Sequence, residues 1–293
     1  MSSLHSWIDA SRPKTLVAGI VPVMVGSCMA FSHLKTSNWL LITLCLVFSV
    51  LIQIGTNFAN DYYDFIKGAD KRRENAPQRA STSGKVEPIR MRNASFMTLT
   101  LAFFVGFLLL YFSKASPILV LVGIGSVICA LGYTGGPYPL AYNGLGDVFV
   151  ILAFGFVAVE ITNYVLLSAG GIKWEPAVAP GLGVGCIINN ILVVNNYRDY
   201  DEDKKVFKNT SVVLFGKAFG KLLFFSCLLV STFVCPILDS RLLFCVVVFP
   251  IGIFAYLNMI RAKNSKSFSF ALGLSSLCVL LYGFAASSGI LLK

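Results

Sequence analysis

Two short acidic segments, residues 57–64 and 195–203, are the parts of the sequence best suited to chemistry. Seven of the 14 acidic residues fall within residues 61–70 and 199–203. On a helix, side chains three or four positions apart share one face. The residues that share a face by this spacing are Asn57, Asp61 and Asp64 in the first segment, and Asn195, Asn196, Asp199 and Asp203 in the second. The two segments are therefore interpreted as two versions of one motif, a helix face that carries Asn and Asp side chains.

The carboxylates of these segments predict a site for a hard divalent cation. A carboxylate at the C-terminal end of a helix faces the negative end of the helix dipole, so it requires a positive counterpart. Magnesium takes oxygen ligands and is usually bound by a few carboxylates together with substrate phosphates. Cationic side chains that could bind phosphate oxygens follow both segments, among them Lys67, Arg79 and Lys208. The combination predicts a magnesium–diphosphate site rather than acidic residues that only cap helices.

The composition of the whole chain indicates a membrane protein. Of its 293 residues, 56% are hydrophobic and only 13% are charged, and the mean hydropathy is +0.75. Soluble domains carry about 25% charged residues, so a soluble enzyme, a disordered chain and a disulfide-stapled secreted domain are excluded. The eight cysteines form no CxxC pair and only two histidines occur, which argues against zinc, redox and histidine-metal sites. We expect a single all-α membrane domain over residues 1–293.

Nine segments approach the roughly 20 apolar residues that a helix needs to cross a bilayer. They are residues 15–33, 39–60, 94–112, 116–133, 146–168, 177–197, 219–237, 242–260 and 270–291. With the N-terminus in the cytoplasm, 19 of the 24 Lys and Arg residues lie inside and 5 lie outside. The nine segments predict a nine-helix bundle, and the asymmetry predicts a cytoplasmic N-terminus, an external C-terminus and two long basic loops in the cytoplasm. A location in the plasma (inner) membrane and a cytoplasm-facing active-site cavity are expected from the family resemblance described below. The net charge of +10 is assigned to the cytoplasmic loops and not to nucleic-acid binding.

Two further features are candidates for function. The loop from Tyr133 to Asp147 carries no Lys or Arg and is rich in Gly and Pro, which indicates tight turns. We expect this loop to be a lid or a wall against an acceptor molecule, with Asp147 capping the start of the next helix. Glu160 falls within a predicted span, where a carboxylate is costly and is a functional candidate by default.

The two acidic segments resemble the aspartate-rich motifs of the UbiA superfamily of intramembrane prenyltransferases. The likeness is carried by Asn60-Asp61-x-x-Asp64 and by Asp199-x-x-x-Asp203. It extends over residues 7–16, 60–80, 133–147 and 195–210 and is closest to the branch that acts on 1,4-dihydroxy-2-naphthoate in menaquinone biosynthesis. Many members of the superfamily have a third aspartate where this chain has Gly68. The naphthoate branch is similar to this chain in carrying Asp70 instead.

The resemblance implies an enzyme that transfers a polyprenyl group. It implies that Asp61, Asp64, Asp199 and Asp203 bind Mg²⁺, which bridges polyprenyl diphosphate. In the same way Lys67, Arg79 and Lys208 would neutralise the diphosphate leaving group. The residues predicted to bind or support around them are Asn57, Asn60, Asp70, Tyr133, Asn195, Asn196, Tyr197 and Arg198. The acceptor would be 1,4-dihydroxy-2-naphthoate, which would lose CO₂ and become demethylmenaquinol.

Two other functions remain open at this point. The first is prenylation of 4-hydroxybenzoate or a related phenolic acid, since only likeness in residues 133–147 favours the naphthoate. The second is a membrane transporter of ions or solutes, in which carboxylates form an ion path. Transporters place such carboxylates near the bilayer midplane, whereas here they lie at helix ends beside phosphate-binding cations. The oligomeric state is not predicted.

Overall fold

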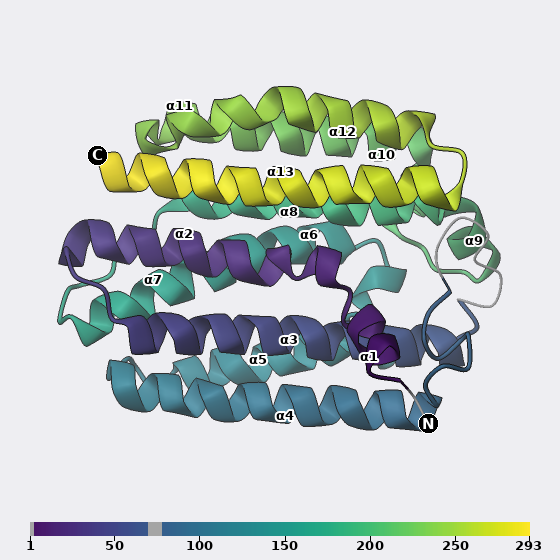
Figure 1. Ribbon diagram of the computed structural model, residues 1–293, viewed down its shortest axis with the longest axis horizontal. Helices are drawn as coiled ribbons and strands as arrows, with labels where there is room; N and C mark the ends of the chain where they lie inside the picture. Colours follow the sequence, from purple (N-terminus) through teal and green to yellow (C-terminus); the bar gives the residue numbers. More distant parts are fainter. Residues whose placement is uncertain (1–2, 70–77) are drawn as a thin grey trace.

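The protein is an elongated bundle of helices that lie along one long axis (Figure 1). The computed structural model describes residues 3–69 and 78–293, and within these ranges the regular secondary structure is entirely helical. Asp70, one of the predicted binding residues, lies outside the described residues. The all-α architecture expected from composition is therefore confirmed.

The helices and their bounds follow the order of the chain. They are α1 (Leu4–Ser11), η1 (Pro13–Thr15), α2 (Val17–Leu34), α3 (Trp39–Ile66), α4 (Pro88–Ser113), α5 (Leu119–Gly132), η2 (Leu140–Tyr142), α6 (Gly146–Val150), η3 (Ile151–Val157), α7 (Ala158–Ala169), α8 (Val178–Arg198), α9 (Tyr200–Lys205), α10 (Ser211–Leu229), η4 (Val230–Val234), α11 (Cys235–Leu238), η5 (Ser240–Val248), α12 (Phe249–Arg261) and α13 (Ser265–Leu292). Three rods are composite: α6–η3–α7, α10–η4–α11 and η5–α12. Both η3 and η4 are π-helical turns.

Eight of these rods are long and apolar enough to cross a membrane, counted over the described residues. The fourth predicted span, residues 116–133, forms only the 14-residue helix α5. Residues 116–118 are taken up by turns, in which the amides of Leu119 and Val120 donate to the carbonyls of Ser116 and Pro117. A 14-residue helix is about 21 Å long, shorter than the roughly 30 Å hydrocarbon core. The expected nine full-length spans are thus found as eight long rods and one short apolar helix.

The helices approach one another closely where glycines face each other. A Cβ atom on Gly155 of the π-helical turn η3 would lie 2.4 Å from the carbonyl oxygen of Gly181 on α8. A Cβ atom on Gly185 would lie 2.5 Å from the carbonyl oxygen of Ile151. Small residues let helix backbones pack at this distance in membranes. This contact places α8, which carries the second acidic segment, against the composite rod α6–η3–α7.

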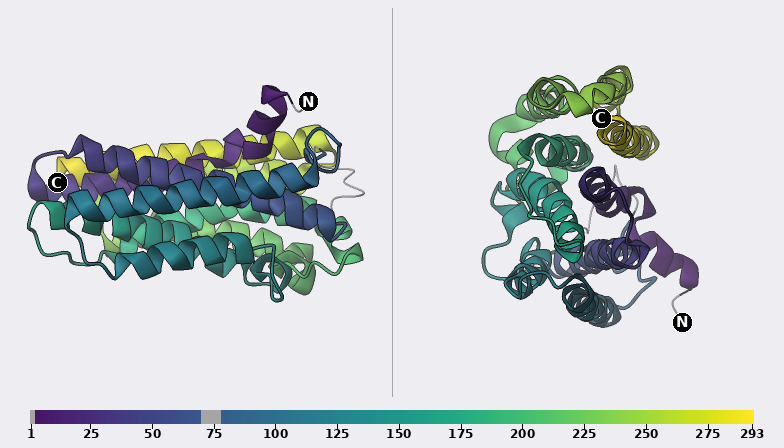
Figure 2. Two further views of the ribbon diagram at one scale, coloured as in Figure 1. Left: turned by 90° about the horizontal axis from the view of Figure 1, so that it is seen from below. Right: turned by 90° about the vertical axis from the view of Figure 1, so that its left-hand side faces the viewer.

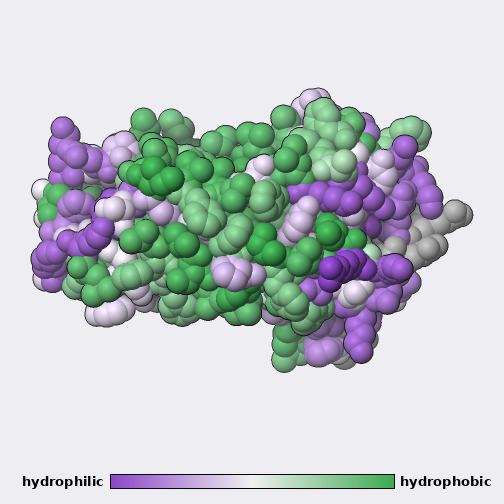
Figure 3. Space-filling view, turned by 90° about the horizontal axis from the view of Figure 1, so that it is seen from above, coloured by the Kyte–Doolittle hydropathy of each residue, from purple (hydrophilic) through white to green (hydrophobic). Residues whose placement is uncertain are grey.

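The two ends of the bundle differ in what they carry. The N-terminus, the end of α3 at Ile66 and the end of α8 at Arg198 lie at one end, which we call the acidic end, and the C-terminus lies at the other, the distal end (Figure 1). Helix α1 stands away from the side of the bundle at the acidic end (Figure 2). The visible surface is apolar along the middle and polar towards both ends (Figure 3). This pattern suits a chain that spans a bilayer with its acidic segments at one interface.

Candidate active site

The first acidic segment forms the last turns of α3, and its polar side chains are buried. Asn57, Asn60, Asp61 and Asp64 are all less than 9% exposed. The two carboxylates have different surroundings. Both oxygens of Asp61 accept backbone N–H groups, from Ala80 and Ser81, at 3.1 Å each. Asp61 therefore fixes the loop that precedes α4 in this structure, a contact that the shared helix face did not predict.

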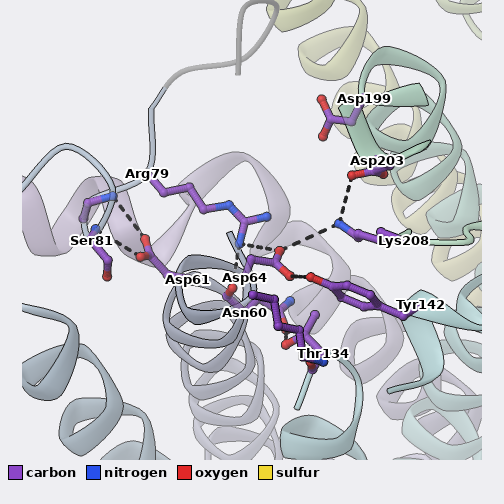
Figure 4. A network of polar contacts seen from close by, with 12 residues as sticks. Asn60, Asp61, Asp64, Arg79, Ser81, Thr134, Tyr142, Asp199, Asp203 and Lys208 are labelled. Carbon is purple, nitrogen blue, oxygen red and sulfur yellow. Dashed lines mark hydrogen bonds and ion pairs between the residues drawn. The ribbon is translucent and has the colours of Figure 1, made fainter. Parts of the chain in front are cut away.

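Asp64 lies at the centre of a network of polar contacts (Figure 4). Its Oδ1 accepts the hydroxyl of Tyr142 at 2.7 Å. Its Oδ2 lies 2.8 Å from the guanidinium of Arg79 and 3.7 Å from Nζ of Lys208. Arg79 also donates to the carbonyl oxygen of Asn60 at 2.7 Å, so it is held against the end of α3 from two sides. The Asp64 carboxylate, only 1% exposed, is thus surrounded by cations and one hydroxyl.

The second acidic segment spans a break between two helices. Helix α8 ends at Arg198, and α9 begins at Tyr200, with Asp199 between them. The guanidinium of Arg198 binds the Asp199 carboxylate through two hydrogen bonds, of 2.6 and 2.8 Å. Asp203 lies on α9, and its Oδ1 is 3.5 Å from Nζ of Lys208. The backbone N–H of Asp203 bonds the carbonyl of Asp199 at 2.8 Å, which joins the short helix to the end of α8.

Lys208 joins the two segments because its ammonium contacts Asp64 and Asp203 together. The two carboxylates therefore lie within reach of one shared positive charge, as expected for segments that face each other. Asp61 and Asp199 do not join this group and are bound by the loop amides and by Arg198 instead. The structure brings two of the four predicted metal ligands together.

The third predicted cation, Lys67, also lies beside Tyr142. Its Nζ donates to the carbonyl of Thr134 at 2.7 Å and lies 4.3 Å from the centre of the Tyr142 ring. Burial lowers the pKa of Lys67, the nearby Asp64 carboxylate opposes that effect, and the Lys208 ammonium adds to it. Burial also raises the pKa of Tyr142 far above its usual value, and the charge of Asp64 adds to the rise. The Tyr142 hydroxyl therefore remains a hydrogen-bond donor to Asp64.

The predicted supporting residues divide between the cavity and the frame around it. The side-chain oxygen of Asn60 accepts a hydrogen bond from the hydroxyl of Thr134 at 2.8 Å. Asn57 donates to the carbonyl of Ser11 at 2.8 Å and so fixes the turn between α1 and α2. The ring of Tyr197 packs within the core, and its centre lies 5.9 Å from Nζ of Lys217. Of the predicted supporting residues that the structure describes, all except Tyr197 line the cavity described next, and these are Asn57, Asn60, Tyr133, Asn195, Asn196 and Arg198.

A cavity of about 560 Å³ connects this polar cluster with the interior of the bundle. At the acidic end it is lined by Asp64, Arg79 and Lys208, together with Asp199. Elsewhere its wall is mainly apolar and includes side chains of α3, α4, α5 and α7, among them Cys45, Phe103, Phe107, Leu110, Leu119 and Val165. Cys45 and Asp64 are 19 residues apart on α3, which corresponds to about 28 Å of helix. The cavity therefore suits a molecule with an anionic head and a long apolar tail.

The donor chemistry at the acidic end fits a hard divalent cation. The charged donors are carboxylates, which magnesium prefers, and Asp64 and Asp203 already share one positive charge. Within residues 3–69 and 78–293, no group of three or more His, Cys, Asp or Glu side chains is gathered closely enough to hold a metal. Asp61 and Asp199 would have to exchange their present partners to join Asp64 and Asp203.

Several contacts around the site come from residues for which the sequence predicted no specific partner. Thr134 and Tyr142 belong to the charge-free loop, whose composition was the available signal. The carboxylate of Asp147 accepts the hydroxyl of Ser211 and ties this loop to the start of α10. Glu160 lies far from the acidic segments along the bundle and accepts the indole N–H of Trp174 at 3.1 Å and the amide of Ala177 at 3.3 Å. In this structure Glu160 therefore anchors the loop between α7 and α8.

Comparisons with known proteins agree with this geometry. The model of the UbiA prenyltransferase family matches residues 19–277. The chain is 31% identical to the 1,4-dihydroxy-2-naphthoate octaprenyltransferase of Haemophilus influenzae over 78% of this chain and 74% of that protein. It is 35% identical to the protein of the same name from Mycobacterium leprae, over 79% and 76%.

The fold is also that of a solved UbiA structure. A UbiA homologue from Archaeoglobus fulgidus, solved with GPP and Mg²⁺, superposes with a TM-score of 0.61 at 17% sequence identity, covering 97% of this chain and 99% of that one. The family match, the relatives and the apolar rods together support one conclusion. The chain belongs to the UbiA prenyltransferase family and is a multi-pass membrane prenyltransferase.

Proposed function

We propose that this prenyltransferase transfers a polyprenyl group from polyprenyl diphosphate to 1,4-dihydroxy-2-naphthoate, with loss of CO₂ and diphosphate and formation of demethylmenaquinol. The observation that carries the proposal is the Asp64–Lys208–Asp203 junction at the acidic end of a long apolar cavity. The naphthoate as acceptor is supported by the two relatives named above, which are 1,4-dihydroxy-2-naphthoate octaprenyltransferases.

The residues at the acidic end suit the departure of diphosphate. In the reaction the C–O bond between the prenyl group and diphosphate breaks, and its electron pair leaves with the diphosphate. Arg79 and Lys208 would stabilise the charge on the departing oxygens, because preorganised cations in a dry site act strongly on developing charge. Mg²⁺ bound by Asp64 and Asp203, with Asp61 and Asp199 as further predicted ligands, would supply additional neutralisation of the diphosphate.

The apolar wall serves the second half of the reaction. An allylic cation would be quenched by water, and the apolar lining keeps water away from it. The electron-rich ring forms a carbon–carbon bond to that cation, and the ring carboxylate leaves as CO₂, so that its bonding electrons restore the aromatic ring. We propose that the acidic end faces the cytoplasm, in an inner membrane, with the prenyl tail in the hydrocarbon layer.

The test is prenyl transfer by membranes that contain the full chain, with and without Mg²⁺. 1,4-Dihydroxy-2-naphthoate and 4-hydroxybenzoate are offered in parallel, and the naphthoate carries a labelled carboxylate. We expect a prenylated naphthalenediol and one labelled CO₂ per product, both lost when EDTA removes the metal. Product from 4-hydroxybenzoate alone would contradict the assigned acceptor, and unchanged turnover in EDTA would contradict the assigned metal.

A further inference from the structure

Tyr142, at the end of η2 in the charge-free loop, contacts Asp64 of the first acidic segment and Lys208, which follows the second (Figure 4). Its hydroxyl donates to Oδ1 of Asp64 at 2.7 Å. Its ring centre lies 4.3 Å from Nζ of Lys67 and 5.5 Å from Nζ of Lys208. The side chain is 9% exposed and packs with Ala69 and Ala141. One aromatic residue thus contacts the central carboxylate and two of the three predicted diphosphate-binding cations.

The hydroxyl of Tyr142 fixes the orientation of the Asp64 carboxylate, with one oxygen facing Tyr142 and the other facing Lys208. Because Oδ1 is bound by Tyr142, the carboxylate cannot rotate without losing that bond. Oδ2 is the oxygen that lies near Arg79 and Lys208, and Lys208 leads on to Asp203. Groups that orient a metal-binding carboxylate by a hydrogen bond commonly strengthen the affinity of the site for its metal.

The ring and the backbone of Tyr142 make a second connection. An aromatic face attracts an ammonium group within about 6 Å of its centre, so the ring favours the present positions of Lys67 and Lys208. The carbonyl of Tyr142 also accepts the backbone N–H of Asn209 at 3.2 Å, and Asn143 forms an isolated bridge with Asn209. Asn209 directly follows Lys208, so this pairing fixes the start of the chain segment that carries the shared cation.

We propose that Tyr142 is a positioning residue for diphosphate binding, which couples the two acidic segments by orienting Asp64 and by supporting Lys67 and Lys208. The ligand class is a diphosphate bound together with a divalent cation. The inference rests on the proposed function for its substrate. It adds to the site a residue of the charge-free loop, which lies outside both acidic segments.

The test measures binding of inorganic diphosphate to the purified full chain in the presence of Mg²⁺, by equilibrium dialysis. Tyr142→Phe keeps the ring and removes the hydroxyl, and we expect it to weaken diphosphate binding about 10- to 100-fold. Tyr138→Phe is the matched control, because Tyr138 lies in the same loop with its side chain 63% exposed, and its binding is expected to equal that of the wild type. The melting temperature without ligand is recorded for each variant.

A double-mutant cycle separates positioning from general stabilisation. If Tyr142 acts through Asp64, adding Tyr142→Phe to an Asp64→Asn variant will change binding by no more than about twofold. An undiminished effect in that background would overturn the proposal. So would a Tyr142→Phe protein that melts earlier but binds diphosphate as the wild type does.

Two further results keep the inference distinct from the proposed function. If Tyr142→Phe does not fold, Tyr142→Gln and Tyr142→Leu are compared, since glutamine retains a donor for Asp64. We expect tighter diphosphate binding by the Gln variant, and equal binding would overturn the proposal. Tyr142-dependent diphosphate binding without transfer to the naphthoate would contradict the proposed function alone. Transfer to the naphthoate together with wild-type binding by Tyr142→Phe would contradict this inference alone.

Discussion

The two acidic segments have similar residue types but different backbones. The first lies on the continuous helix α3, whereas the second crosses the break between α8 and α9 at Asp199. In each segment one carboxylate faces Lys208, namely Asp64 or Asp203, and the other is bound by a local partner. That partner is a pair of loop amides for Asp61 and the guanidinium of Arg198 for Asp199. Like spacing therefore places one carboxylate of each segment beside Lys208 and the other beside a local partner, and Asp199 also lines the cavity.

The largest expected effect follows from neutralising the shared carboxylate of the first segment. Asp64→Asn removes the negative charge that faces Arg79 and Lys208. We expect prenyl transfer to fall about 10²- to 10³-fold, the size typical of losing a preorganised electrostatic group. Initial rates of transfer at saturating Mg²⁺ measure this. A rate close to that of the wild type would contradict the distinction drawn between the two carboxylates of the first segment. It would mean that the carboxylate facing Lys208 is not needed for transfer.

Lys208→Met tests the cation that joins the two segments. The change leaves Asp64 and Asp203 without the ammonium that both contact. The two carboxylates then repel each other, so they should bind a metal cation more tightly than in the wild type. We expect weaker diphosphate binding by about 10- to 150-fold, as for the loss of a buried charged partner worth about 1.5–3 kcal/mol. We also expect tighter binding of Mn²⁺ in the absence of diphosphate, followed by electron paramagnetic resonance. Weaker Mn²⁺ binding would show that Lys208 and the metal do not compete.

Asp61→Asn tests the carboxylate that is bound by its own loop. An amide oxygen can replace only one of the two acceptors that hold the N–H groups of Ala80 and Ser81. We expect a loss of about 1–3 kcal/mol in the free energy of unfolding, because a buried N–H is left without its acceptor. Thermal unfolding in detergent checks this, and transfer should fall less than in Asp64→Asn. An equal loss of transfer would mean that both aspartates of the first segment act in the reaction.

Asp201→Asn should have the smallest effect. Asp201 belongs to the second segment, but its side chain is 69% exposed and pairs with Lys217 at the surface, at 2.8 Å. Exposed ion pairs contribute about 0–1 kcal/mol. We expect unchanged transfer and a melting temperature close to that of the wild type. A large loss of transfer would show that acidic character alone, and not position relative to Lys208, decides which residues matter.

Residue types and helical spacing predicted which segments form this site, but not which partner each of their side chains has. A shared location for the two segments was expected, because both were placed at helix ends on one side of the membrane. The contact of Asp64 and Asp203 with Lys208 was not predicted, since Lys208 was assigned to the diphosphate. The partners of Asp61 were not, since backbone amides some 20 residues away carry no side-chain signal. Tyr197 was assigned to the site by its position in the segment, yet the turn of α8 directs it into the core. The shortness of α5 was missed because the predicted span was begun at residue 116, although Ser116 and Pro117 are turn residues at which the helix has not yet started.

The contacts of Tyr142 and Thr134 depend on how the charge-free loop folds back over the acidic end. The loop was recognised from its Gly and Pro residues, but tertiary contacts decide which of its side chains face Asp64 and Asn60. Glu160 shows the opposite case. A carboxylate within a span suggested function, and its partners Trp174 and Ala177 show that it anchors a loop.

Anomalous diffraction from crystals of the full chain grown with Mn²⁺ and inorganic diphosphate tests the central claim most directly. We predict an anomalous peak between the carboxylates of Asp64 and Asp203, with diphosphate density beside Arg79 and Lys208. A peak bound by one segment alone, with the other carboxylate out of reach of the diphosphate, would contradict the account.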